Sequence, residues 1–259
     1  MTPSNSPPGT VANANANAPE RDGRTAPPAS ESAQELLGRL TRPAAEPPCS
    51  PNVRWQRSAM TRERRWGSLG QVGATVWFTG LPGAGKSTIA GAVEERLLAV
   101  GQSAFLLDGD NLRHGLNGDL GFDECARSEN VRRTAHVARL MAESGTIALV
   151  GLVSPYAADR EAAAALHAAA GLDFIEIFVD APLELCEQRD SKGLYARARR
   201  GELCGLTGVG APYEAPTHPD LVVGGWEETV QGQADRVLEA LAARGLLADG
   251  APGRLSPAG

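Results

Sequence analysis

The 259-residue sequence predicts an α/β protein with three layers, in which helices cover both faces of a five-stranded, mostly parallel sheet. Two observations predict this fold class. Short apolar runs alternate with helical patterns between residues 74 and 246, and the connections between them are short. A glycine-rich segment also lies between the first apolar run and the first helical pattern, as in nucleotide-binding βα units.

Each element follows from its local pattern. The first expected strand is the β-rich run from Ala74 to Thr79, and the others cover 103–107, 146–153, 174–179 and 220–223. The expected helices cover 87–100, 127–144, 156–170, 182–189 and 227–244. The helix over 127–144 shows one apolar stripe with helical spacing, made of Val131, Ala135, Ala138 and Met141.

The chain divides by composition into four segments. Residues 1–51 are rich in Pro, Ala and Asn with few large apolar side chains, so we expect a disordered tail with a short helix near 33–40. Residues 52–73 form a basic arm, expected to be a helical arm that packs on the core rather than a nucleic-acid patch. The main domain covers 74–246, and 247–259 is expected to be a second disordered tail.

Composition excludes several classes of protein. The net charge of −6 disfavours a nucleic-acid binder, and the four cysteines show no C-x-x-C spacing or paired framework, which indicates a reducing compartment. The longest apolar stretch, 147–153, is too short to span a bilayer, and the amino terminus lacks a secretory pattern. We therefore expect a cytoplasmic protein with neither a nucleic-acid nor a membrane partner.

The segment from Gly80 to Thr88 has the spacing G-x-x-x-x-G-K-[ST] of a phosphate-binding loop, or P-loop. Its glycines allow backbone N–H groups to converge on phosphate oxygens at a helix N-terminus. Lys86 is expected to reach the β- and γ-phosphates, and Ser87 to ligate Mg²⁺. The sequence therefore predicts a nucleoside triphosphate site made of Gly80, Leu81, Pro82, Gly83, Ala84, Gly85, Lys86, Ser87 and Thr88.

Two carboxylates follow the second expected strand, at Asp108 and Asp110. The carboxyl ends of strands in an open α/β sheet face the ligand crevice, so both side chains are expected to point toward the nucleotide phosphates. A carboxylate there can hold Mg²⁺, directly or through water, or accept a proton from an attacking hydroxyl. We assign Asp110 as the base or hydroxyl-orienting group and Asp108 as support for the metal's water shell.

The sequence resembles the adenylyl-sulfate kinase family from about residue 55 to about residue 241. The resemblance is carried by TGLPGAGKSTIA (79–90), LLDGDNLRHGLNGDLGF (106–122), RSENVRR (127–133), SPYAADRE (154–161), FVDAPLELCEQRDSKGLYARARRGE (178–202), LTG (206–208) and PYEAP (212–216). It implies a P-loop kinase fold and ATP- and Mg²⁺-dependent phosphorylation of the 3′-hydroxyl of adenosine 5′-phosphosulfate (APS), giving PAPS and ADP. It also implies a homodimer, and we expect the preceding ATP sulfurylase to be a separate chain.

The resemblance assigns acceptor-binding roles as well. Guanidinium groups suit a phosphosulfate, and the matching positions here are Arg113 and Arg127, with Phe122 as the aromatic that stacks on adenine. The other residues that it places at the acceptor are Asp110, Asn111, Asn130, Val153, Ser154, Lys192, Gly205 and Leu206.

The stretch from Arg189 to Arg200 has the composition of a basic lid over the γ-phosphate, and Arg189 and Lys192 match family positions. The counterpart of Ser154 contacts substrate in the family and has been assigned there as a phosphoserine intermediate. Direct in-line transfer requires only positioning and charge neutralisation, so we expect no covalent step at Ser154.

Two positions depart from the family pattern: Cys204 replaces a lysine and Leu206 replaces a second stacking phenylalanine. These changes predict weaker binding of the acceptor, with the phosphoryl-transfer residues intact. Two alternatives stay open. One is a nucleotide-binding regulatory protein with weak turnover, and the other is a related small-molecule P-loop kinase. A GTPase is disfavoured, because no N-K-x-D run occurs.

Overall fold

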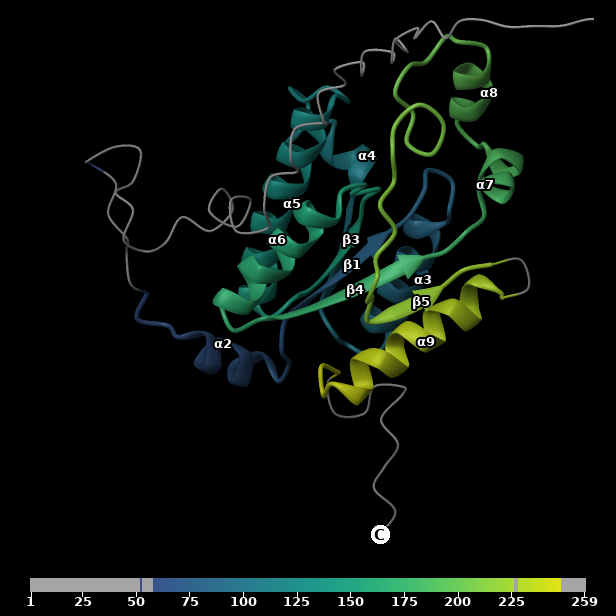
Figure 1. Ribbon diagram of the computed structural model, residues 1–259. Coiled ribbons are helices and arrows are strands. Elements are labelled where there is room, and N and C mark those ends of the chain that lie inside the picture. The colour runs from purple at the N-terminus through teal and green to yellow at the C-terminus, as the bar shows by residue number, and fades with distance from the viewer. Residues whose placement is uncertain (1–51, 53–57, 226–227, 248–259) are drawn as a thin grey trace, which may run out of the picture. The chain divides into compact units, whose positions relative to one another are not determined.

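The computed structural model describes residues 52, 58–225 and 228–247 (Figure 1). The tail predicted over 1–51, its short helix near 33–40, and residues 248–259 lie outside the described residues. Leu247, which the prediction places in the second tail, is buried in the hydrophobic core.

The predicted fold class is confirmed. Five strands form one sheet in the order β2-β3-β1-β4-β5, and every pairing in it is parallel. The strands are β1 (Ala74–Thr79), β2 (Ala104–Asp108), β3 (Ile147–Gly151), β4 (Asp173–Val179) and β5 (Leu221–Val223). Each strand begins and ends within two residues of the predicted position.

Helices cover both faces of the sheet (Figure 1). On one face lie α3 (Lys86–Ala99) and α9 (Val230–Ala243), and on the other lie α5 (Glu124–Ser144) and α6 (Ala157–Ala169). Side chains of a strand alternate between faces. Accordingly Val76 and Phe78 belong to the core cluster beneath α3 and α9, whereas Trp77 belongs to the cluster beneath α5 and α6. The middle strand β1 thus joins two hydrophobic cores.

Two further helices lie among the described residues where no helix is predicted: α4 (Gly109–Leu112) and α8 (Leu194–Arg199). Helix α2 (Arg62–Leu69) lies within the arm that is expected to be helical. The remaining helix, α7 (Leu183–Arg189), matches its prediction. Helix α5 begins at Glu124, earlier than predicted, because the Asp123 carboxylate caps it by accepting a hydrogen bond from the Ala126 N–H at 3.0 Å.

Helix α2, which lies within the predicted arm, contacts two of the helices that cover the sheet and the turns after them. Arg62 donates a hydrogen bond to the Ala170 carbonyl at 2.6 Å, and Arg65 donates one to the Glu143 carbonyl at 3.2 Å. The side chain of Thr61 caps the helix by accepting from the Arg64 N–H.

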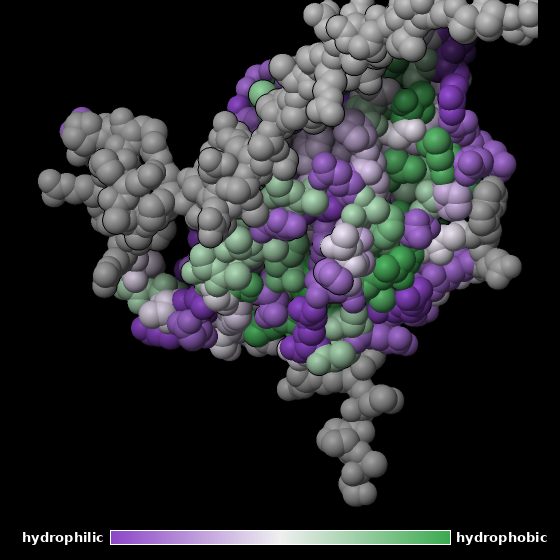
Figure 2. Space-filling view, in the orientation of Figure 1, coloured by the Kyte–Doolittle hydropathy of each residue, from purple (hydrophilic) through white to green (hydrophobic). Residues whose placement is uncertain are grey.

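On the face shown in Figure 2, hydrophilic and hydrophobic residues are interspersed. Among the helices that the structure describes, none combines the length and apolar character that crossing a bilayer requires.

Candidate functional site

A cavity of about 730 Å³ lies at the carboxyl edge of the sheet. Its walls come from the P-loop, the ends of β2 and β3, the segment that joins α7 to α8, and the stretch between β5 and α9. Ligands of open parallel sheets bind at this edge, where the chain leaves the strands. The cavity therefore lies at the edge of the sheet where the sequence predicts the site.

The P-loop has the backbone that its glycines permit. Gly80, Gly83 and Gly85 have φ values of 150°, 77° and 107°, in the region that L side chains rarely adopt. At Gly80, a Cβ atom would also lie 2.6 Å from the carbonyl oxygen of Val179 on β4. The loop leads directly into α3, so its backbone N–H groups lie at a helix N-terminus, which favours an anion.

Lys86 is folded back onto this loop. Its Nζ donates hydrogen bonds to the carbonyl oxygens of Gly80 at 2.9 Å and Leu81 at 2.8 Å, and the residue is 8% exposed. Burial lowers the pKa of Lys86 to about 8, against smaller opposing effects that include the nearby Asp108 carboxylate. The ammonium is thus held at the loop by two carbonyl oxygens, whose place phosphate oxygens could take.

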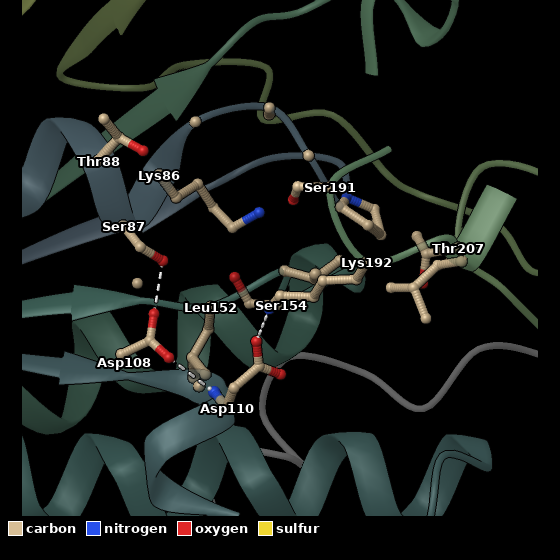
Figure 3. Close-up of a pocket in the computed structure, with 18 of the residues that line it drawn as sticks. Lys86, Ser87, Thr88, Asp108, Asp110, Leu152, Ser154, Ser191, Lys192 and Thr207 are labelled. Atoms are coloured by element: carbon tan, nitrogen blue, oxygen red, sulfur yellow. Dashed lines mark hydrogen bonds and ion pairs between the residues drawn. The ribbon is translucent and has the colours of Figure 1, made fainter. Parts of the chain in front are cut away.

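Two oxygen ligands for a hard cation meet beside the loop (Figure 3). The Ser87 hydroxyl donates to Asp108 Oδ2 at 2.5 Å. The other carboxylate oxygen of Asp108 caps α4, accepting from the N–H groups of Asp110 at 2.9 Å and Asn111 at 3.2 Å. No group of three or more His, Cys, Asp or Glu side chains arranged to hold a metal ion occurs among the described residues. A hydroxyl and one carboxylate fit Mg²⁺, which is commonly held by one or two such ligands together with substrate phosphates.

Asp110, in α4, faces the lid segment across the cavity. Its carboxylate forms an ion pair with Lys192, which lies between α7 and α8 (Figure 3). The predicted base and the predicted lid cation are therefore in direct contact.

The rest of the lid divides into two groups. Arg189 donates to the Ala84 carbonyl at 3.0 Å, and the Tyr195 hydroxyl donates to the Pro82 carbonyl at 2.8 Å, so both contact the P-loop. By contrast, Arg199 pairs with Glu187 at 2.5 Å and Arg200 pairs with Glu202 at 2.7 Å, away from the cavity. Only the first group lies where it can meet a nucleotide.

Opposite the lid, Arg113 and Phe122 form one wall. The Arg113 guanidinium lies over the Phe122 ring, 4.2 Å from its centroid, and donates to the Leu120 carbonyl at 2.9 Å. Phe122 is 65% exposed, which is unusual for a large aromatic ring and leaves its other face available to a flat ligand. Burial and the nearby Arg127 charge both lower the pKa of Arg113.

Arg127, in α5, joins this wall to a distant part of the chain. Its guanidinium donates to the Phe122 carbonyl at 2.7 Å, to the Gly205 carbonyl at 2.8 Å and to the Thr207 hydroxyl at 2.8 Å. Asn130 lies one helical turn further along, buried, and accepts from the Asn117 amide at 3.0 Å. The wall is thus built by side-chain contacts rather than by neighbouring strands.

Ser154 is held in a strained backbone, with φ 38°. Its hydroxyl accepts from Trp77 Nε1 at 3.1 Å and donates to the Thr79 hydroxyl at 3.0 Å, and the residue is 3% exposed. The buried Arg160 donates to the Ser154 carbonyl at 2.7 Å. Ser154 lines the cavity with its hydroxyl already engaged in the core.

Most predicted site residues line this cavity together. They are Pro82, Gly83, Ala84, Gly85, Lys86, Ser87, Thr88, Asp108, Asp110, Arg113, Phe122, Arg127, Asn130, Val153, Ser154, Arg189, Lys192 and Leu206. Four lie outside its lining: Gly80, Leu81, Asn111 and Gly205. Three of these still serve the site through backbone carbonyls, because Gly80 and Leu81 hold Lys86 and Gly205 holds Arg127. Asn111 contributes its N–H to Asp108.

The residue-by-residue prediction missed several lining residues: Tyr195, Thr207, Gly224, Gly225 and Gln233. Tyr195 and Thr207 stand inside the KGLY and LTG runs, which is a signal that could have identified them. Gln233 had no signal, since a single polar residue in an amphipathic helix is ordinary.

Comparison with known proteins shows which family the chain resembles. The model of the adenylylsulphate kinase family matches residues 72–224. An adenylyl-sulfate kinase of Clostridium kluyveri is 48% identical over 195 residues, which cover 75% of this chain and 96% of that protein. The bifunctional enzyme CysN/CysC of Mycobacterium tuberculosis is 50% identical over 192 residues, 74% of this chain and 30% of that one.

A solved structure shows the same fold. The Mycobacterium tuberculosis APS kinase CysC, in complex with AMPPNP and APS, is 52% identical with a TM-score of 0.65, and the match covers 66% of this chain and 99% of that one. The two proteins therefore share the fold that carries the P-loop of the present chain. By sequence and by structure, the chain belongs to the adenylylsulphate kinase family.

Proposed function

We propose that this protein transfers the γ-phosphoryl group of ATP to the 3′-hydroxyl of APS, giving PAPS and ADP. The observation that carries the proposal is one cavity that places a phosphate loop between two dissimilar walls. One wall carries the arginines and the exposed Phe122 ring, and the other carries Gly224, Gly225 and Gln233. A relative that is 52% identical has a structure with AMPPNP and APS, which is the pair of ligands that two such walls suit.

The donor phosphates would bind the P-loop. Lys86 exchanges its two carbonyl partners for phosphate oxygens, and Arg189, already at the Ala84 carbonyl, lies where it can neutralise charge on the same group. Lys192 leaves Asp110 for the transferred group as the acceptor arrives. These cations oppose the charge of the transition state, and the lid excludes water, whose attack would hydrolyse ATP instead.

The acceptor would lie against the opposite wall. Arg113 and Arg127 suit its phosphosulfate, since guanidinium groups bind such anions through paired hydrogen bonds. The open face of Phe122 suits its adenine. Asp110 is the carboxylate placed to take the proton of the attacking hydroxyl once Lys192 has moved.

Mg²⁺ would be held by Ser87 and supported by Asp108, whose oxygens meet at 2.5 Å. When bound, the ion would neutralise charge on the transferred phosphoryl group. Transfer would be direct, because the Ser154 hydroxyl is shared between Trp77 and Thr79 and the residue is 3% exposed.

The further expectations concern assembly and location. We propose a homodimer in the cytoplasm, which rests on the family resemblance and on the composition. Light scattering coupled to gel filtration tests the assembly, and a mass other than that of two chains contradicts it.

The proposed activity is tested by measuring ADP release with Mg·ATP, with and without APS, and by identifying PAPS as the product. We expect release that depends on APS, with one PAPS formed for each ADP. Release without APS, or none with it, contradicts the proposal and favours another acceptor or a regulatory role.

A further inference from the structure

A buried amide stands in the cavity wall that follows β5. Gln233, in the first turn of α9, lines the cavity beside Gly225 and Val230 and is 5% exposed. Its side-chain oxygen Oε1 is buried and accepts no hydrogen bond from the residues that the structure describes. Among the buried side-chain polar atoms without a partner in the described part of the chain, Oε1 of Gln233 is the one that belongs to a residue of the cavity wall. Such an acceptor gains free energy when a ligand donates to it.

The orientation of this amide is fixed. Its Nε2 donates to the Glu228 carbonyl at 2.9 Å, and turning the amide over would place two acceptor oxygens against each other. Glu228 is anchored in turn, because its carboxylate accepts from Arg236 at 3.1 Å and Arg236 donates to the Val222 carbonyl of β5 at 2.7 Å. Oε1 is therefore directed away from Glu228 in advance of any ligand.

The strand order indicates which ligand group comes to this wall. The P-loop follows β1, the central strand, and fixes the phosphates there. Asp108 and Asp110 follow β2, at one edge of the sheet, so the acceptor lies on that side. The wall with Gln233 follows β5, at the opposite edge, and the donor's ribose and base extend toward it. Beside Gln233, no atom of the described residues lies within 4 Å of where a Cβ of Gly225 would stand.

We infer that Gln233 selects the base of the phosphoryl donor, with Oε1 accepting a hydrogen bond from the 6-amino group of adenine. Guanine and hypoxanthine carry a carbonyl oxygen at C6, which accepts hydrogen bonds as Oε1 does. Bound in the same position, they would leave their own oxygen and Oε1 of Gln233 buried without a donor. A site that hydrogen-bonds a ligand group rejects analogues that lack it, because its own buried polar atom is then left without a partner. This inference rests on the proposed function for the direction in which the donor lies.

The test compares binding of ADP and IDP, which differ at C6, by calorimetry on the full chain. We expect wild type to bind ADP at least about tenfold more tightly than IDP. Gln233→Met keeps the length of the side chain without the amide, and it should bring the ratio to within about threefold, mainly by weakening ADP binding. Gln231→Met, at an exposed position of the same helix, is the matched control and should keep the wild-type ratio.

Two results overturn the inference: equal binding of ADP and IDP by wild type, or an unchanged ratio in Gln233→Met. The wild-type comparison decides the matter even where Gln233→Met fails to fold, which its melting temperature reports. Diphosphate binding needs no APS, so failure here is separate from failure of the proposed function. If the protein made PAPS from ATP and ITP equally well, the proposed function would hold and the role inferred for Gln233 would be wrong.

Discussion

Lys192 and Asp110 are bound to each other as an ion pair, although 82 positions separate them in the chain. Both side chains are largely exposed, so the pair contributes little to stability. Its effect is on the site, because the carboxylate that would take the hydroxyl proton is covered by a lid cation until ligands arrive. Ser87 with Asp108, and Lys86 with its loop carbonyls, show the same self-pairing. We expect ligands to displace the present partners of Lys86 and Lys192 when they bind.

Asp110→Asn should lower kcat by on the order of 10²–10⁴, since an amide cannot take the proton, and should leave the KM for ATP within about threefold. Steady-state kinetics with varied ATP and varied APS measure both. Glu202→Gln, which removes another exposed carboxylate from an ion pair but lies outside the cavity, is the control and should behave as wild type. If Asp108→Asn proves much the more damaging of the two aspartate variants, the assigned roles are reversed.

ATP binding should depend on pH through Lys86. Burial places the pKa of Lys86 at about 8 in the ligand-free protein, below its ordinary value of 10.5, and phosphate would raise it by favouring the charged form. Above about pH 8 the free protein has lost this proton and must take it up on binding, so affinity falls as pH rises. Calorimetry in two buffers of different ionisation enthalpy measures the uptake. Lys86→Arg, which stays charged, should abolish it, and uptake that persists in this variant contradicts the assignment.

Ser154→Ala should retain kcat within about tenfold if transfer is direct, because only a local contact is lost. It should also lower the free energy of unfolding by about 1–3 kcal/mol, since Trp77 Nε1 would be left buried without an acceptor. Urea unfolding and rapid-quench kinetics measure the two effects. A phosphoserine that forms and decays at the turnover rate would establish the covalent route instead.

The buried His167 should make the protein sensitive to acid. Its ring nitrogens contact the Thr75 hydroxyl at 2.9 Å and the Ala163 carbonyl at 2.8 Å, and burial lowers the pKa of His167 to about 4 from 6.5. Between these values the unfolded chain binds a proton that the folded chain refuses, so stability is full above pH 6.5 and is lost as pH falls toward 4. The total is on the order of 3 kcal/mol.

Urea unfolding at pH 7, 6 and 5 tests this dependence. His167→Asn should be less stable at pH 7 and should lose less stability on acidification than wild type. His218→Asn, which changes an exposed histidine, should keep the wild-type slope. Equal slopes in all three proteins would mean that other groups dominate the acid response.

The P-loop and the strands could be predicted from the sequence because each depends on residues close together in the chain. Gly80, Gly85 and Lys86 lie within one short motif whose backbone conformation the glycines permit. The carboxylates Asp108 and Asp110 could be placed from the end of a strand alone. In each case a local pattern was enough.

The acceptor wall could not be predicted from local patterns in the sequence. The bond from Arg127 to Thr207 joins residues 80 positions apart, and no local pattern reports it. Nor does periodicity reveal the left-handed backbone of Ser154, which the surrounding contacts impose. Leu206 was predicted as a base-facing position, and it does line the cavity, but at 8% exposure it also packs in the core. Whether such a side chain contacts the cavity, the core or both depends on packing between segments that are distant in the sequence.

The contacts of Arg127 have a consequence for how the site forms during folding. The P-loop is formed by residues that follow one another in the chain, between β1 and the start of α3, whereas the acceptor wall requires α5 to meet Gly205 and Thr207 across nearly eighty residues of chain. Contacts that close long loops form later, because the entropy of closure must be lost before they are made. We therefore expect refolding chains to acquire nucleotide affinity before they acquire acceptor affinity. A chain stopped between these stages would bind ATP and have no substrate to phosphorylate.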